Sequence, residues 1–136
     1  MSGAEELQGQ AERVLALEPE HPGASYMLGK LHASVRRLGG VKRFLATTLF
    51  GGGALKGASW EEARSLLEQS VRGDPCVPEH HFELARVYAH DENVQGWERE
   101  LAAVFELTES GDAREARLRA RAEGFQKEWR EKGGGA

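Results

Sequence analysis

The chain has 136 residues, of which 40% are hydrophobic and 29% charged, a balance typical of one soluble globular domain with one core. No apolar run approaches the roughly 18 residues that a membrane span needs. The N-terminus lacks the basic segment followed by an apolar segment that is typical of a signal peptide. The single cysteine, Cys76, excludes an internal disulfide, and the formal net charge is −4.

Apolar residues at helical spacing predict two helices in the first part of the chain. The first has an apolar face made of Leu7, Ala11 and Val14. It should end before Pro19, because a proline disfavours helical geometry in the residue that precedes it. The second is expected from Pro22 through Leu38 and contains Gly29, which costs about 1 kcal/mol of helix propensity relative to alanine. A small residue at this place would suit a close approach by a neighbouring helix.

The stretch from His21 to Trp60 contains no aspartate or glutamate but six lysine and arginine residues. This asymmetry is typical of a surface that faces anions; the alternative is a basic element packed against its own acidic neighbours. Within the stretch, residues 41–50 predict a short amphipathic helix, which Gly51–Gly53 would end. Its basic and apolar residues could contact an anionic membrane, or its apolar side could be buried on the rest of the chain. The predicted membrane or lipid contacts are Lys42, Arg43 and Phe44.

Four more helices are expected after residue 58. Ser59 and Glu62 have the spacing of a capping box, which predicts a helix that ends before Pro75. The next two helices are expected at residues 79–90 and around residues 97–105. Gly111-Asp112 should start the last one, whose apolar face is formed by Leu118, Ala122, Phe125 and Trp129. Its other face is charged, with Glu115–Arg119 and Glu123–Lys127 spaced as ion pairs, which is typical of a capping helix.

A leucine and a small residue stand nine and ten residues after each of two prolines: Leu28-Gly29 after Pro19, and Leu84-Ala85 after Pro75. This pattern resembles the first helix of a tetratricopeptide repeat, whose period is 34 residues. The two prolines are 56 residues apart, which is 22 more than one period. We therefore expect an insertion at about residues 36–58, between the two helices of the central repeat.

The predicted fold class is all-α, a short tetratricopeptide-like helical-hairpin solenoid with an inserted helix and a C-terminal capping helix. It should form a single domain over residues 1–132, followed by a flexible tail at 133–136. Residues 26–30, 42–51 and 58–63 resemble the regulator of microtubule dynamics family and its bacterial relatives, and the likeness covers roughly residues 20–130. The resemblance implies a helical-repeat fold and a binding role.

In such stacks the first helix of each repeat lines the concave face. Helical positions five, nine and thirteen, counted from Pro22 and Pro78, are occupied by Tyr26, Lys30, Ser34, Phe82, Arg86 and His90. Arg37, from the acid-free stretch, is included in the predicted binding surface. Each repeat thus offers an aromatic residue and, one turn later, a cation that can bind a carboxylate or phosphate. The alternative is that Lys30 and Arg86 are only solvated.

These residues predict a non-catalytic scaffold that binds a protein or peptide partner. The partner could carry acidic side chains, which would contact the cations of the concave face. A second interpretation is a carrier or sensor of a hydrophobic or anionic lipid-like ligand, held between the concave face and the 41–50 helix. A third is self-association, since the first helix lacks a repeat partner. The expected location is the cytoplasm, or the periplasm or a membrane if a targeting segment precedes this sequence.

Catalysis, a metal site and a cofactor are not expected. Cys76 with His80 and His81, and His90 with its acidic neighbours, lack the spacing of a zinc site. No phosphate loop or nucleophile motif is present in the sequence. The isoelectric point of about 5.8 argues against nucleic acid as a partner.

Overall fold

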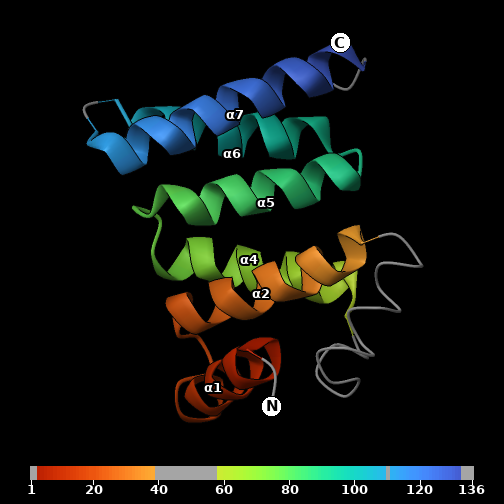
Figure 1. The fold of residues 1–136 in the computed structure, drawn as a ribbon, viewed down its shortest axis with the longest axis vertical. Coiled ribbons are helices and arrows are strands. Elements are labelled where there is room, and N and C mark those ends of the chain that lie inside the picture. Colours follow the sequence, from red (N-terminus) through yellow and green to blue (C-terminus); the bar gives the residue numbers. More distant parts are fainter. Residues whose placement is uncertain (1–2, 39–57, 110, 133–136) are drawn as a thin grey trace. The chain divides into compact units, whose positions relative to one another are not determined.

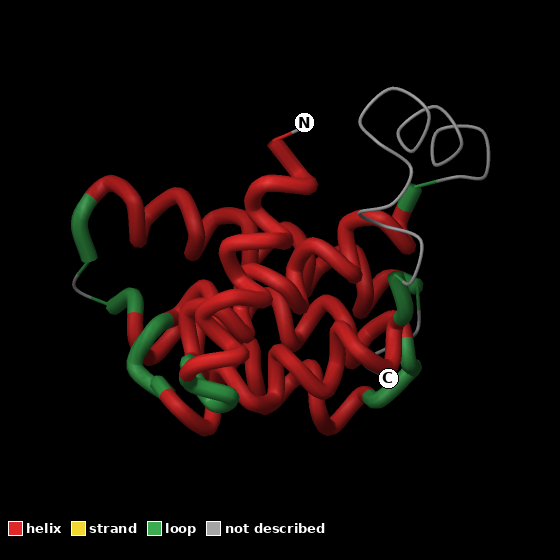
Figure 2. Tube along the Cα trace, turned by 90° about the horizontal axis from the view of Figure 1, so that it is seen from below, coloured by secondary structure: helices red, strands yellow, loops and turns green. Residues whose placement is uncertain are grey.

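The computed structural model describes residues 3–38, 58–109 and 111–132, and this part contains helices and no strand (Figures 1 and 2). The helices are α1 (Gly3–Leu17), α2 (Pro22–Arg37), α4 (Trp60–Gly73), α5 (Pro78–His90), α6 (Val94–Leu107) and α7 (Ala113–Glu131). The all-α prediction is confirmed, and each helix expected within these ranges is present. The predicted helix at 41–50, with Lys42, Arg43 and Phe44, lies outside the described residues, as does the predicted tail.

Contacts divide the chain into two compact units, Met1–Gly73 (unit 1) and Asp74–Ala136 (unit 2), and each is described by itself. Unit 1 contains α1, α2 and α4, and unit 2 contains α5, α6 and α7. The single domain over residues 1–132 stays a prediction. None of the described helices is both long enough and apolar enough to cross a lipid bilayer.

In unit 1, α2 packs against both α1 and α4. Ala63 and Leu67 of α4 are fully buried, and Gly29 of α2 faces them. A Cβ at Gly29 would lie 2.9 Å from Leu67 Cγ, closer than packed carbon atoms approach, and a tight 3.2 Å from the Ala63 carbonyl oxygen. The helices do approach closely at this glycine, as a small residue at this place would suit.

The start of α4 corrects the predicted capping box. The Ser59 hydroxyl accepts the Glu62 backbone N–H at 2.9 Å, so the serine caps the helix as expected. The other half of the box differs, because the Ser59 backbone N–H donates to His32 Nδ1 of α2 at 3.1 Å. In a complete capping box, the Glu62 carboxylate would accept the Ser59 backbone N–H. Here the packing of α2 against α4 places the His32 ring beside that N–H instead.

In unit 2, α6 packs against α5, and α7 contacts both. Trp97 and Leu101 of α6 are fully buried, and Leu118 and Ala122 of α7 are buried as well. Phe125 of α7 packs edge-on against two rings: Phe82, with centroids 6.1 Å apart, and Trp97, with centroids 6.2 Å apart. The apolar face predicted for the last helix is thus confirmed as a packing face.

The charged face of α7 differs from the expected pairing. Arg119 pairs with Glu123 at 3.5 Å rather than with Glu115. Its Nη1 also donates to the Phe105 carbonyl at 2.8 Å and to the Thr108 hydroxyl at 3.2 Å. Because the last carbonyls of a helix lack intrahelical partners, Arg119 satisfies the end of α6 and ties it to α7.

Candidate binding surface

Tyr26, Lys30 and Ser34 lie along one face of α2, since residues four apart are neighbours on a helix. Lys30 and Ser34 are exposed, and Tyr26 is half-buried. The Lys30 ammonium lies 5.7 Å from the centroid of the Tyr26 ring, a cation–π contact within the helix. Lys30 forms no ion pair with any described residue. Its positive charge therefore stays uncompensated at the surface of unit 1.

Arg37 has a different role within unit 1. Its guanidinium carbon lies 5.7 Å from the centroid of Trp60, the first residue of α4. Arg37 is half-buried and connects the end of α2 with the start of α4. A side chain in such a position contributes to packing as well as charge.

The corresponding residues of α5 show the same local arrangement with one difference. The Arg86 guanidinium carbon lies 5.7 Å from the centroid of Phe82, as Lys30 does from Tyr26. However, Phe82 is only 3% exposed, and Arg86 Nη1 lies 3.1 Å from the Glu83 carboxylate. The charge of Arg86 is thus largely compensated within its own helix.

His90 is exposed at the end of α5, with Nδ1 3.4 Å from the Asp91 carboxylate. The row of predicted residues on α2 belongs to unit 1, and the row on α5 belongs to unit 2. The structure brings the members of each row together on one helix. One concave surface shared by both rows stays a prediction.

Arg121 of α7 is a candidate that sequence reasoning missed. Its guanidinium carbon lies 5.0 Å from the centroid of Phe82, the ring that Arg86 also covers. Arg121 is exposed and makes no hydrogen bond or ion pair within the described part of the chain. One feature of the sequence points to Arg121 as an unpaired cation: no residue three or four positions away is acidic, so its own helix offers no ion-pair partner.

A buried ion pair links α5 with α6. His81 Nδ1 lies 2.8 Å from Glu100 Oε1, and His81 Nε2 lies 2.7 Å from the Pro75 carbonyl oxygen. Arg99 Nε donates to the second Glu100 oxygen at 2.9 Å. Both ring nitrogens of His81 face acceptors, so the protonated imidazole, which donates from both, satisfies the site.

Burial alone would lower the pKa of His81, but the bonds to Glu100 and to the Pro75 carbonyl outweigh it and raise the pKa above the ordinary 6.5. Burial would raise the pKa of Glu100, but its bonds to His81 and Arg99 lower that pKa below the ordinary 4.5. The sequence placed His81 at a core position, and its burial confirms this. Glu100 was missed, although it follows Trp97 by three residues and so shares the apolar face of α6.

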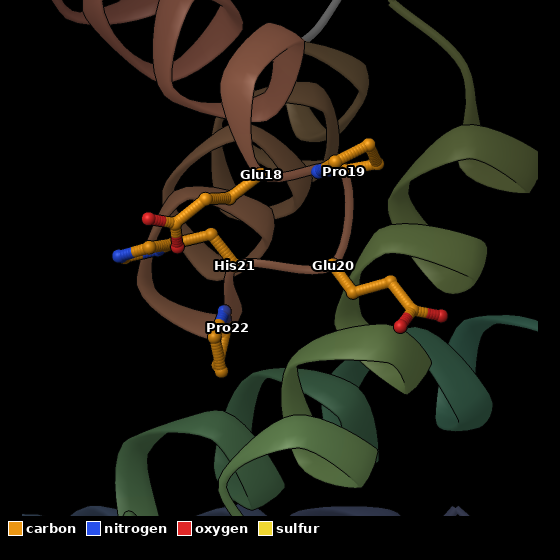
Figure 3. Close-up of a pocket in the computed structure, with 5 residues that line it drawn as sticks. All are labelled: Glu18, Pro19, Glu20, His21 and Pro22. Carbon is orange, nitrogen blue, oxygen red and sulfur yellow. The ribbon is translucent and has the colours of Figure 1, made fainter.

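The described residues hold no group of three His, Cys, Asp or Glu side chains suited to a metal ion. Figure 3 shows a hollow at the turn between α1 and α2, lined by residues 18–22, with the Glu18 and Glu20 carboxylates on opposite sides of the turn. His21 Nδ1 accepts the Ala24 N–H at 3.1 Å and so caps α2. Gln69 of α4 donates to the Pro19 carbonyl at 2.7 Å. These contacts serve to hold the turn and start α2.

The packed helices of the two units define an all-α protein of the helical-repeat type. The sequence model of the family described as Regulator of microtubule dynamics protein 1-3 matches residues 1–126. The chain therefore belongs to this family, as the resemblance implied. No curated protein and no solved structure matches the chain.

Proposed function

We propose that the chain is a non-catalytic binding module built on the tetratricopeptide plan, with α2–α4 and α5–α6 as successive hairpins. The spacing of the second helices supports this plan. Trp60 and Val94 begin two helices of 14 residues each, and they are 34 residues apart, which equals the period of the repeat. The first helices begin at Pro22 and Pro78, and the excess length lies between α2 and α4.

The partner proposed is a protein or peptide with acidic side chains. The observation that carries this proposal is Lys30, an exposed and uncompensated cation beside Tyr26, in a stretch without acidic residues. The ammonium can take a carboxylate, and the half-buried ring offers apolar area next to it. The chain as a whole carries −4, so attraction of an acidic partner must come from local cations.

Fluorescence anisotropy with a labelled peptide of alternating Glu and Ser tests the proposal, with an alternating Gln and Ser peptide as the neutral comparison. Lys30→Glu removes one attraction and adds a repulsion, so we expect binding to weaken roughly tenfold, or about 1.4 kcal/mol. Arg72→Glu is the matched control, because Arg72 is exposed in the last turn of α4 and the charge change is the same.

Equal losses in the Lys30 and Arg72 variants would reduce the effect to net charge and contradict a surface on α2. Equal binding of the two peptides by the wild-type chain would contradict an acidic partner. Native mass spectrometry of the purified protein addresses the carrier interpretation. A heavier species that releases a discrete small mass would favour a lipid-like ligand over a peptide.

A further inference from the structure

Three arginines follow one side of α7, and the first and the last of them contact α5. Arg114, Arg117 and Arg121 are three and four residues apart, so they form a stripe along the helix. Both ends of the stripe contact α5: Arg114 Nη2 lies 3.0 Å from Glu79 Oε2, and the Arg121 guanidinium carbon lies 5.0 Å from the Phe82 centroid. The stripe therefore runs along the edge that α5 and α7 share within unit 2.

The charges on this edge do not cancel. Glu79 compensates Arg114, and Glu83 compensates Arg86. Arg117 and Arg121 are exposed and form no ion pair with any residue that the structure describes. No acidic residue lies three or four positions from either of them, so α7 itself offers no partner. Two adjacent guanidinium groups are thus left with net positive charge on a chain whose total charge is −4.

Arg121 is also held in place before any ligand binds. Its guanidinium lies over Phe82, and that ring is itself fixed by burial and by the edge-on contact with Phe125 at 6.1 Å. A cation–π contact supplies no charged acceptor, so the N–H donors can still bind a carboxylate in the two-pronged geometry that arginine favours. A side chain that is already ordered loses less conformational entropy on binding.

We infer that unit 2 has a binding surface of its own along α7, where Arg117 and Arg121 take two carboxylates of an acidic peptide in extended conformation. Four residues of helix rise about 6 Å, and alternate side chains of an extended peptide are about 6.6 Å apart. Carboxylates at alternate positions therefore match the spacing of these two arginines. This inference rests on the proposed function and names residues of unit 2 that would recognise the partner.

The test uses the full chain and the labelled peptide of alternating Glu and Ser. Arg121→Gln should raise the dissociation constant about five- to tenfold, and Arg121→Lys should recover part of the affinity, because it restores the charge without the paired donors. Arg130→Gln is the matched control: Arg130 is exposed on the same helix, nine residues on and about half a turn away around the axis. Its dissociation constant should change less than about twofold.

Far-UV circular dichroism of each variant separates loss of binding from loss of fold. If Arg121→Gln unfolds, the dissociation constants of Arg121→Lys and the wild-type chain are compared instead. Lysine keeps a cation beside the ring, so this variant should remain folded. Equal affinity of wild type and Arg121→Gln, with binding still weakened in Lys30→Glu, would overturn the role of α7 and leave the proposed function standing. Absence of binding by the wild-type chain would overturn both.

Discussion

Gly29 lets α4 lie directly against α2, because glycine has no Cβ. A Cβ at this position would meet Leu67 Cγ at 2.9 Å, Leu66 Cβ at 3.1 Å and the Ala63 carbonyl oxygen at 3.2 Å. Leu67 is fully buried and the carbonyl belongs to the helix backbone, so neither can move aside without cost. Gly124 of α7 is the opposite case, because it is exposed and an added Cβ would meet nothing within 4 Å.

Gly29→Ala should therefore lower the free energy of unfolding by about 1–2 kcal/mol, since overpacking outweighs the gain in helix propensity. Gly124→Ala should raise it by about 0.5–1 kcal/mol, because the propensity gain is unopposed there. Urea denaturation monitored by circular dichroism measures both. A Gly29→Ala chain as stable as Gly124→Ala would mean that α2 and α4 are farther apart than described.

For single residues, the sequence predicted the position on a helix better than the side chains that each residue contacts. Counting from Pro22 and Pro78 placed Lys30 and Arg86 at equivalent positions, and the structure gives both the same contact with the preceding aromatic ring. The pairing of Arg86 with Glu83 was not predicted, although Glu83 lies only three residues away in the same helix. The contact of Arg121 with Phe82 joins two helices, and helical periodicity carries no information on such pairs.

At the scale of the element, three helices besides α2, which His21 caps, begin at a side chain that accepts the backbone N–H three residues later. These bonds are Ser59 to Glu62 at 2.9 Å, Asn93 to Gly96 at 2.9 Å and Asp112 to Glu115 at 3.0 Å. Caps and prolines leave strong local signals, which is why the helix bounds could be predicted. The hydrogen bond from the Ser59 N–H to His32 could not be predicted, because it depends on how α2 packs against α4.

Ser59→Ala should destabilise unit 1 by about 1 kcal/mol, because the Glu62 N–H loses its acceptor at the start of α4. Ser59→Asp keeps an acceptor and adds a negative charge near a helix N-terminus, so it should retain most of the stability. Ser34→Ala is the control, since Ser34 is exposed within α2 and caps no helix. Thermal unfolding followed by circular dichroism gives the comparison; equal losses in the alanine and aspartate variants would contradict the capping role.

At the scale of the whole molecule, the two units contain histidines that respond to protons with opposite sign. In unit 1, burial lowers the pKa of His32 below 6.5, although Glu62 and Glu12 oppose the shift. The neutral ring accepts the Ser59 N–H through Nδ1. In unit 2, the pKa of His81 is raised above 6.5, because its bonds to Glu100 and the Pro75 carbonyl outweigh burial.

The lowered pKa of His32 means that its contribution to stability is complete above pH 6.5 and is lost as the pH falls through the folded value. The raised pKa of His81 means that its contribution is complete below pH 6.5 and is lost as the pH rises through the folded value. The lowered pKa of Glu100 keeps that carboxylate ionised across the same range, so the His81 pair stays intact at mildly acidic pH.

Acidification from about pH 8 to pH 5.5 should therefore weaken local protection in α2 and α4 and strengthen it in α5 and α6. Hydrogen–deuterium exchange, corrected for the intrinsic pH dependence of amide exchange, measures the two units separately. His32→Gln should flatten the response of unit 1 and His81→Gln that of unit 2, each leaving the other unit as in the wild-type chain. A response of the same sign in both units would contradict the opposed titration of the two histidines.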